Sequence, residues 1–253
     1  MIRQEANRNQ QANILLFELY NTILYKPLFN AVVFLYGVLP GQDFGLAIVA
    51  LTIIIRLVFF PLTVKTIRSQ RALSRINPKM KEIREKFKND AQAQSAAIMN
   101  LYKENNINPL SGCLPLLIQL PILIALYQAF GAGFKPENLE LLYSFVKNPG
   151  SINAISFGFL DITKSSPILT ITAGISQFFQ LKQNSSLMGQ AGGAGGSGGQ
   201  KEIQAMNKQM LYFFPVMIII IGWNLPAGLL LYWLVTTAFS VGEQMYIKRK
   251  YKD

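Results

Sequence analysis

Apolar residues gather in runs that are separated by polar and charged segments. A helix needs about 20 apolar residues to cross a bilayer. The last apolar block, 209–247, is too long for one crossing, and NLPAG at 224–228 is a turn signal that divides it. The pattern therefore predicts five transmembrane helices, at about 44–64, 110–130, 166–181, 209–225 and 227–247.

Residues 1–43 form a separate N-terminal segment before the first span. Residues 1–13 are polar, whereas 14–39 are apolar but interrupted by Glu18, Lys26 and other polar residues. We interpret 14–39 as an amphipathic helix in the membrane interface. The alternative is an additional span or an uncleaved signal anchor.

A charged segment, 65–109, lies between the first two spans and carries ten basic and four acidic residues. Asn77-Pro78 is typical of an N-cap followed by the first helical position. KNDA at 88–91 is a turn signal, and apolar residues return at helical spacing at Ile98, Leu101 and Tyr102. The segment is therefore predicted to be an antiparallel helical hairpin outside the bilayer.

The distribution of lysine and arginine predicts the orientation. Seventeen lie on the side of the hairpin, the 182–208 loop and the 248–253 tail, against six on the other side. The richer side is expected to be cytoplasmic, which places the N-terminus outside and the C-terminus inside. We expect the glycine-rich stretch within 182–208 to be a flexible linker, and 44–247 to form the core of the protein.

Composition supports a membrane protein and argues against an enzyme. The chain is 51% hydrophobic and 15% charged, with a net charge of +11, whereas soluble domains carry about 25% charged residues. It has no histidine and one cysteine, which removes the commonest general base and excludes an intrachain disulfide and a cysteine-based zinc site. No carboxylate pair lies in the spans, so no catalytic residue, metal or cofactor is expected.

Arg56 stands alone in the apolar run ALTIIIRLVFFPLT at 50–63. An arginine at the bilayer centre costs roughly 2.5–3.5 kcal/mol, so it is expected to face protein, water or a partner. No acidic residue inside a span is a predicted partner, because Glu243 lies near the cytoplasmic end of the last one. We therefore expect Arg56 to bind water, carbonyl groups or an anion in a polar groove.

Polar residues on other spans could line the same groove. The candidates are Thr52, Gln119, Gln177, Trp233 and Thr237. The structural alternative is that threonine bonds its own helix and glutamine bridges two helices. Trp233 and its neighbour Tyr232 are alternatively lipid-facing packing residues.

Several motifs together resemble the YidC-type membrane protein insertases, a family that includes the Oxa and Alb types. They are RLVFFPLT at 56–63, NPKMKEIREKF at 77–87, NPLSGCLPLLIQLPILIALYQAF at 108–130 and FFPVMIIIIGWNLPAGLLLYW at 213–233. The resemblance covers about residues 26–247, and it is to the short form that lacks the large extracytoplasmic domain.

The resemblance implies an all-α integral membrane protein that moves hydrophobic segments of nascent membrane proteins from the cytosol into the bilayer. The family's hydrophilic groove arginine falls on Arg56, and a groove aromatic falls on Trp233. A bacterial plasma membrane is the expected location, since no Arg- and Ser-rich transit peptide precedes the core. The implied partners are nascent membrane proteins and lipid, with the ribosome, the signal recognition particle pathway and the Sec translocon as further candidates, and no direct nucleic-acid recognition.

The hairpin would receive substrates at the membrane surface through its basic side chains. The residues proposed for this recruitment surface are Arg68, Arg71, Arg75, Lys79, Lys81 and Arg84. The alternative is a solvated charged face that only fixes topology.

Two other functions compete with insertion. A secondary transporter could bind an anionic solute at Arg56, but the sequence has no internal repeat and five spans are few for a transporter. A purely structural scaffold would tolerate leucine at position 56.

Overall fold

The structure is a computed structural model that describes residues 2–108, 114–132, 136–188 and 200–250. Within this part of the chain the fold is α-helical apart from two strands of two residues each, which confirms the all-α expectation. Three predicted features fall partly outside the described residues: the start of the second span at 110–113, the glycine-rich stretch at 189–199 and the end of the tail at 251–253.

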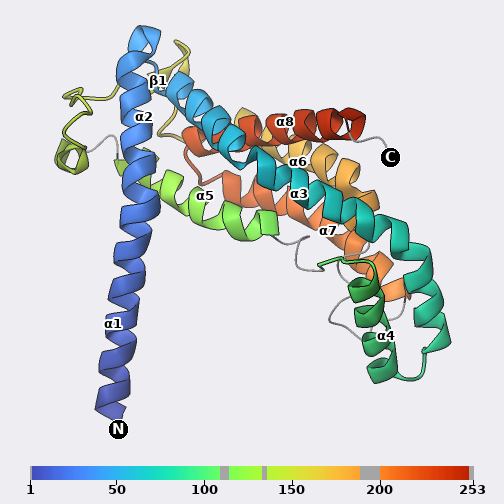
Figure 1. The fold of residues 1–253 in the computed structure, drawn as a ribbon. Helices are drawn as coiled ribbons and strands as arrows, with labels where there is room; N and C mark the ends of the chain where they lie inside the picture. Colours follow the sequence, from blue (N-terminus) through green and yellow to red (C-terminus); the bar gives the residue numbers. More distant parts are fainter. Residues whose placement is uncertain (1, 109–113, 133–135, 189–199, 251–253) are drawn as a thin grey trace. The chain divides into compact units, whose positions relative to one another are not determined.

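The element bounds are as follows (Figure 1). They are α1 Ile2–Tyr20, the π-helix η1 Asn21–Tyr25, α2 Lys26–Val38, the 3-10 helix η2 Pro40–Gln42, α3 Phe44–Lys86, α4 Ala91–Glu104, α5 Leu114–Ala132, the 3-10 helix η4 Pro136–Leu141, β1 Ile155–Ser156, β2 Leu160–Asp161, α6 Pro167–Met188, α7 Gln200–Gly222 and α8 Ala227–Lys250.

The chain divides into two compact units, and each is described by itself. Unit one comprises Met1–Thr52, Ile118–Ser165 and Leu225–Tyr232. Unit two comprises Ile53–Leu117, Ser166–Asn224 and Trp233–Asp253.

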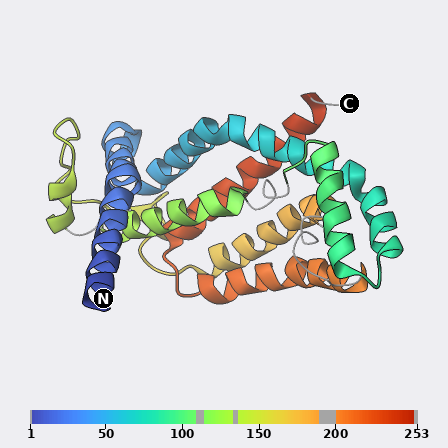
Figure 2. The same ribbon diagram turned by 60° about the horizontal axis from the view of Figure 1, so that its bottom comes forward.

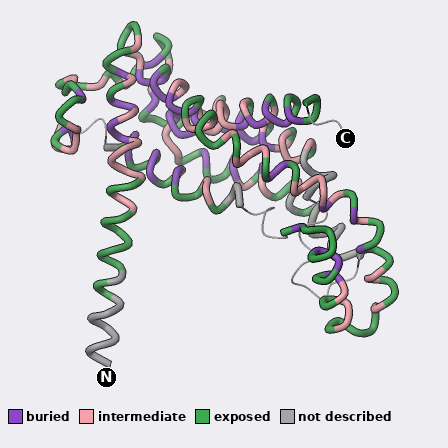
Figure 3. Tube along the Cα trace, in the orientation of Figure 1, coloured by how far each residue is buried: buried purple, intermediate pink, exposed green. Residues whose placement is uncertain are grey.

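In unit one, α1, η1 and α2 follow one another as a single rod (Figure 1). The α2 part is anchored, because Phe29, Val32 and Val33 are buried. The described part of α1 is largely exposed (Figure 3), and its apolar residues from Ile14 to Leu19 include several with more than half of their surface accessible. An apolar exposed surface suits either the interface or a span, so the interfacial placement of 14–39 stays a prediction.

Asn30 fixes α2 to the loop that follows η4. Its amide nitrogen donates hydrogen bonds to the carbonyl oxygens of Lys26 at 2.8 Å and Leu141 at 3.2 Å, and its amide oxygen accepts one from the Tyr143 backbone at 2.6 Å. The side chain is buried. The asparagine that interrupts the apolar N-terminal run thus satisfies loop backbone groups more than 100 residues away in sequence.

A tight turn in unit one also fixes the start of α8. The backbone N–H groups of Ala227 and Gly228 donate to the carbonyl oxygens of Lys164 and Ile162, at 2.8 and 2.9 Å. These bonds satisfy donors that the first turn of a helix leaves unpaired. Asp161 stabilises the turn by accepting hydrogen bonds from Thr163 and Lys164. These bonds, of which that from Thr163 has the larger effect, lower the pKa of the Asp161 carboxyl to about 2.

In unit two, α3 is a single helix of 43 residues that continues from the first predicted span into the hairpin. The prediction that a new helix starts at Asn77-Pro78 is wrong, because Pro78 lies inside α3. Proline removes one backbone hydrogen bond. The helix continues past it because Ile76 and Met80, on either side of the proline, are both buried in the hairpin core.

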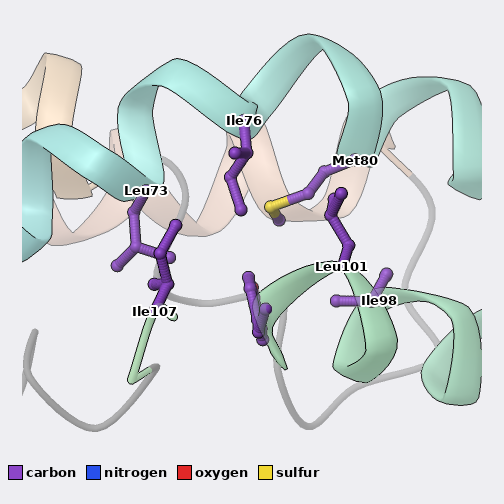
Figure 4. Close-up of a cluster of buried hydrophobic side chains, with 7 residues drawn as sticks. Leu73, Ile76, Met80, Ile98, Leu101 and Ile107 are labelled. Carbon is purple, nitrogen blue, oxygen red and sulfur yellow. The ribbon is translucent and has the colours of Figure 1, made fainter. Parts of the chain in front are cut away.

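The hairpin core joins the end of α3 to α4 (Figure 4). Leu73, Ile76 and Met80 from α3 form one buried cluster with apolar residues that follow the turn, which are Ile98, Leu101, Tyr102 and Ile107. Asp90 caps the start of α4 by accepting hydrogen bonds from the backbone of Gln92 and Ala93. The predicted helical spacing of Ile98, Leu101 and Tyr102 is confirmed by their burial.

Helices α6 and α7 pack side by side as an antiparallel pair (Figure 2). The Thr170 hydroxyl donates to the carbonyl oxygen of Gly222 at 3.1 Å, and the Phe178 ring lies 5.8 Å from the Tyr212 ring. Between these contacts is Gly174, where an added Cβ would meet the Ile219 side chain and lie 3.2 Å from the Pro215 carbonyl oxygen. The glycine therefore lets the two helices approach closely.

One described helix, α3, is long and apolar enough to cross a bilayer by its length and composition. Leu117–Gly131 and Leu211–Gly222 are apolar helices of shorter length. The described helices end near the predicted turn, since α7 stops at Gly222 and α8 begins at Ala227. The count of five spans remains a prediction.

Candidate functional site: a polar cluster around Arg56

Arg56 lies on α3 in unit two, and its guanidinium contacts α8. One terminal nitrogen donates to the backbone carbonyl oxygen of Thr236 at 3.1 Å. The other lies 3.5 Å from a carboxylate oxygen of Glu243. The arginine side chain is 19% exposed and the glutamate side chain 3% exposed. The guanidinium is therefore still reachable, while its acidic neighbour is closed off.

The expectation that Arg56 has no acidic partner in the spans is wrong, because Glu243 is one. The sequence gives the face on which a residue lies, but not the depth at which two helices cross. Glu243 was assigned to the end of the last span, whereas the contact shows that α8 brings it level with Arg56. The signal that was missed is the seven-residue spacing between Thr236 and Glu243. This spacing places both residues on one face of α8, two turns apart.

Contacts between α3 and α8 show that the two helices run parallel in unit two. Beyond the Arg56 contacts, the Phe60 ring lies 6.1 Å from the Tyr246 ring. Arg56 contacts Thr236 and Glu243, and Phe60, which is further along α3, contacts Tyr246, which is further along α8. Parallel directions are what the first and fifth helices of an alternating five-span arrangement require.

Several buried polar atoms near this ion pair have no hydrogen-bond partner. They are the Thr236 hydroxyl oxygen, both carboxylate oxygens of Glu243 and the Gln244 amide oxygen. The Arg56–Glu243 contact is thus an ion pair by distance without hydrogen-bond geometry. Leaving a buried polar group unpaired costs about 1–3 kcal/mol. The α8 face is therefore suited to water or to a ligand that supplies hydrogen-bond donors.

Gln177 and Trp233, both predicted groove residues, meet in unit two. The indole nitrogen of Trp233 donates to the amide oxygen of Gln177 at 2.9 Å. Gln177 on α6 is buried and Trp233 on α8 is partly buried. Thr237, which is also buried, lies one helical turn after Trp233. The structure therefore joins a second pair of predicted polar residues across α6 and α8.

The other two predicted groove residues belong to unit one. The Thr52 hydroxyl donates to the Ile48 carbonyl oxygen at 2.7 Å, which is the structural role that the sequence left open for threonine. The Gln119 amide donates to the Tyr232 hydroxyl. Tyr232 is only 2% exposed, so the lipid-facing alternative is wrong for this residue.

The basic residues predicted for recruitment lie on the α3 arm of the hairpin. Arg68, Arg75, Lys79 and Lys81 are exposed, and Arg71 and Arg84 are partly buried. One terminal nitrogen of Arg84 and the Tyr102 hydroxyl are buried without hydrogen-bond partners. Burial raises the pKa of Tyr102, and the nearby Arg84 charge opposes that rise.

Among the described residues, no group of three or more histidine, cysteine, aspartate or glutamate side chains could hold a metal ion. The polar cluster of unit two consists of one cation, one carboxylate, amides, hydroxyls and an indole. These groups can bind polar segments by hydrogen bonds and charge.

The sequence profile of the 60Kd inner membrane protein family matches residues 34–253. The chain is 35% identical over 233 residues to the membrane protein insertase YidC of Streptomyces avermitilis, covering 85% of this chain and 53% of that protein. It is 34% identical to the YidC of Geotalea daltonii, covering 89% of this chain and 37% of that protein.

The chain thus spans about half or less of the length of these two relatives. A shorter relative, the membrane protein insertase YidC of Fusobacterium nucleatum subsp. nucleatum, is 33% identical over 208 residues, which cover 82% of this chain and 87% of that protein. The profile match and these identities confirm the resemblance noted in the sequence, and the chain belongs to the 60Kd inner membrane protein family.

Proposed function

We propose that the chain is a membrane protein insertase that moves hydrophobic segments of nascent membrane proteins from the cytosol into the lipid bilayer. Membership of the family and similarity to the YidC membrane protein insertases support this activity. The observation that carries the proposal is the α8 face beside Arg56. There, a reachable guanidinium adjoins buried oxygens that lack hydrogen-bond donors.

The proposed substrate site is a hydrophilic groove open to the cytosol. Its proposed lining is Arg56, Thr52, Gln119, Gln177, Trp233 and Thr237. The hydrogen bonds of Arg56 to a backbone carbonyl and of Trp233 to Gln177 support a polar environment for these residues. An intramembrane arginine of this kind is functional by default, because its desolvation has to be compensated.

Insertion follows from the balance of two transfer energies. The polar tail of a substrate must cross hydrocarbon, and a wet groove shortens that path. The apolar helix of the substrate meanwhile leaves water for lipid, which is favourable by about 25 cal/mol per Å² of apolar surface. Arg56 would attract carboxylates of the tail transiently, without forming or breaking a covalent bond.

The hairpin is proposed to receive substrates at the membrane surface. Its exposed basic residues would bind anionic lipid and acidic segments of partners. We propose nascent membrane proteins and lipid as partners, and the ribosome, the signal recognition particle pathway and the Sec translocon as candidates for the hairpin and tail.

The proposed location is the plasma membrane of a bacterium, with the N-terminus outside and the C-terminus in the cytosol. The bacterial relatives support the location. The seventeen basic residues on the hairpin side support the orientation.

The test is insertion of a single-span substrate with an acidic tail into liposomes that contain the purified full chain. Protection of the tail from protease measures insertion. We expect Arg56→Ala to impair it and Arg56→Lys to retain much of it, because a point charge suffices for transient attraction. Full insertion by Arg56→Ala would contradict the groove mechanism, and equal insertion by empty liposomes would contradict the activity itself.

Crosslinking locates the substrate path. A photo-reactive residue at position 177 or 233 should capture a nascent single-span protein, whereas one at the exposed residue Glu140 in η4 should not. Deletion of 78–104 should lower substrate capture while leaving the core folded. A fully active deletion variant would restrict the hairpin to a topological role.

A further inference from the structure

The ion pair between Arg56 and Glu243 changes what the proposed site can bind. We infer that Glu243 competes with substrate carboxylates for Arg56, so that strongly acidic tails lose most of the advantage over tails rich in neutral hydrogen-bond donors that an unpaired arginine would give them. This inference rests on the proposed insertase function and names the substrate class of the same site. It makes Glu243 a specificity-determining residue that the groove prediction did not include.

Charge is the first argument. A lone arginine attracts any carboxylate, but this arginine has a carboxylate 3.5 Å away. An incoming aspartate or glutamate therefore meets attraction from Arg56 and repulsion from Glu243 at similar range. The two largely cancel, which leaves the pair close to neutral as a whole and reduces the advantage of an acidic tail over a neutral one.

Accessibility is the second argument. The Arg56 side chain retains 19% exposure, while that of Glu243 retains 3%. A substrate can therefore reach the guanidinium without first displacing the glutamate. The contact with Glu243 is an ion pair by distance and not the bidentate hydrogen-bonded pair that would hold the guanidinium most tightly.

The unpaired oxygens are the third argument. Besides Glu243, the Thr236 hydroxyl and the Gln244 amide oxygen are buried without partners. Amide and carboxylate oxygens only accept hydrogen bonds. Because these oxygens are covered, they act on a substrate at Arg56 through their negative charge: they attract N–H groups, such as those of an unfolded backbone or of asparagine and glutamine side chains, and repel the acceptors of an aspartate.

The test uses the full chain in liposomes and one single-span substrate in two forms, with two aspartates or two asparagines in its tail. Protease protection gives the ratio of acidic to neutral insertion. We expect Glu243→Gln to raise this ratio about threefold to tenfold, the range of one partly exposed charge pair. Glu140→Gln, which removes the same charge from an exposed position in η4, should leave it unchanged. An unchanged or lower ratio in Glu243→Gln overturns the inference.

Variants of Arg56 distinguish this failure from failure of the proposed function. If Arg56→Gln impairs insertion of the acidic tail but Glu243→Gln leaves the ratio unchanged, Arg56 acts in insertion and competition by Glu243 is wrong. If Arg56→Gln has no effect on either tail, the groove charge is wrong, and the inference falls with it.

Folding is followed in parallel by thermal unfolding in detergent. Arg56→Gln leaves the buried Glu243 carboxylate without a cation and should unfold at a lower temperature than the Arg56→Gln/Glu243→Gln double variant. A double variant that is no more stable than Arg56→Gln would show that the two side chains do not interact, which overturns the inference.

Discussion

The indole of Trp233 and the amide of Gln177 illustrate how single polar residues hold apolar helices together. Each comes from a different helix, and their hydrogen bond of 2.9 Å crosses between α6 and α8. Gln177 is buried, so its amide oxygen has little access to water. Such interhelical bonds contribute about 0.6 kcal/mol on average in membrane proteins, up to about 1.7 kcal/mol.

We predict that Trp233→Phe lowers the free energy of unfolding by about 1 kcal/mol or more, because the N–H donor is lost and the smaller phenyl ring replaces the indole. Gln177→Leu removes the acceptor. If the hydrogen bond is the cause, the double variant should lose less than the sum of the two single variants. Reversible unfolding in mixed micelles measures all three, and strictly additive losses would argue against a direct bond.

Sequence reasoning at this scale identified unusual residues better than their partners. Arg56 was recognisable because it is the one charge in an apolar run. Glu243 was not recognised as its partner, since helical periodicity defines a face but not the depth at which helices cross. Asn30 likewise looked like an interruption, because its partners Leu141 and Tyr143 lie more than 100 residues away.

At the scale of elements, helix contacts depend on where small residues allow close approach. Gly174 on α6 faces Ile219 and the Pro215 carbonyl of α7. Gly131 on α5 has no atom within 4 Å of the position that a Cβ would take. An alanine at position 131 therefore changes helix propensity alone, whereas an alanine at position 174 changes both helix propensity and packing.

Gly174→Ala and Gly131→Ala are predicted to change stability in opposite directions. Alanine is favoured over glycine by about 1 kcal/mol in a helix interior and by less near a helix end, so Gly131→Ala, one residue before the end of α5, should stabilise the protein slightly. Gly174→Ala gains helix propensity but forces α6 and α7 apart, and overpacking costs about 1–3 kcal/mol. Thermal unfolding in detergent compares the two, and a rise in stability for Gly174→Ala would mean that the helices are not closely packed there.

The elements were predictable where local signals agreed. The spacing of Ile98, Leu101 and Tyr102 identified the buried face of α4, and NLPAG identified the break between α7 and α8. The start signal at Asn77-Pro78 failed because buried side chains on both sides of the proline keep α3 continuous. Tertiary packing there outweighed a local capping preference.

At the scale of the whole molecule, orientation in the membrane follows from charge. The hairpin side carries seventeen basic residues and the opposite side six. The membrane potential and the insertion machinery favour retention of positive loops in the cytosol. The parallel course of α3 and α8 in unit two agrees with an odd number of crossings between them, as the three predicted intervening spans require.

Cysteine labelling tests this orientation. In a Cys113→Ser background, single cysteines replace Lys103 in the hairpin and Lys147 in the loop before α6. We predict that a membrane-impermeant maleimide labels position 147 in intact spheroplasts and position 103 only after lysis. The reverse pattern would invert the orientation, and labelling of both positions before lysis would contradict an odd number of spans between them.

The unbroken course of α3 has a mechanical consequence. Arg56 and Met80 lie on one helix and are separated by about 36 Å along its axis at 1.5 Å per residue, with Pro61 and Pro78 inside the helix and no loop between them. We expect a docking event that rotates the hairpin about the helix axis to displace the guanidinium, because continuous helical backbone connects the two. Under the proposed function, the hairpin and the charged site are thus coupled through a single helix.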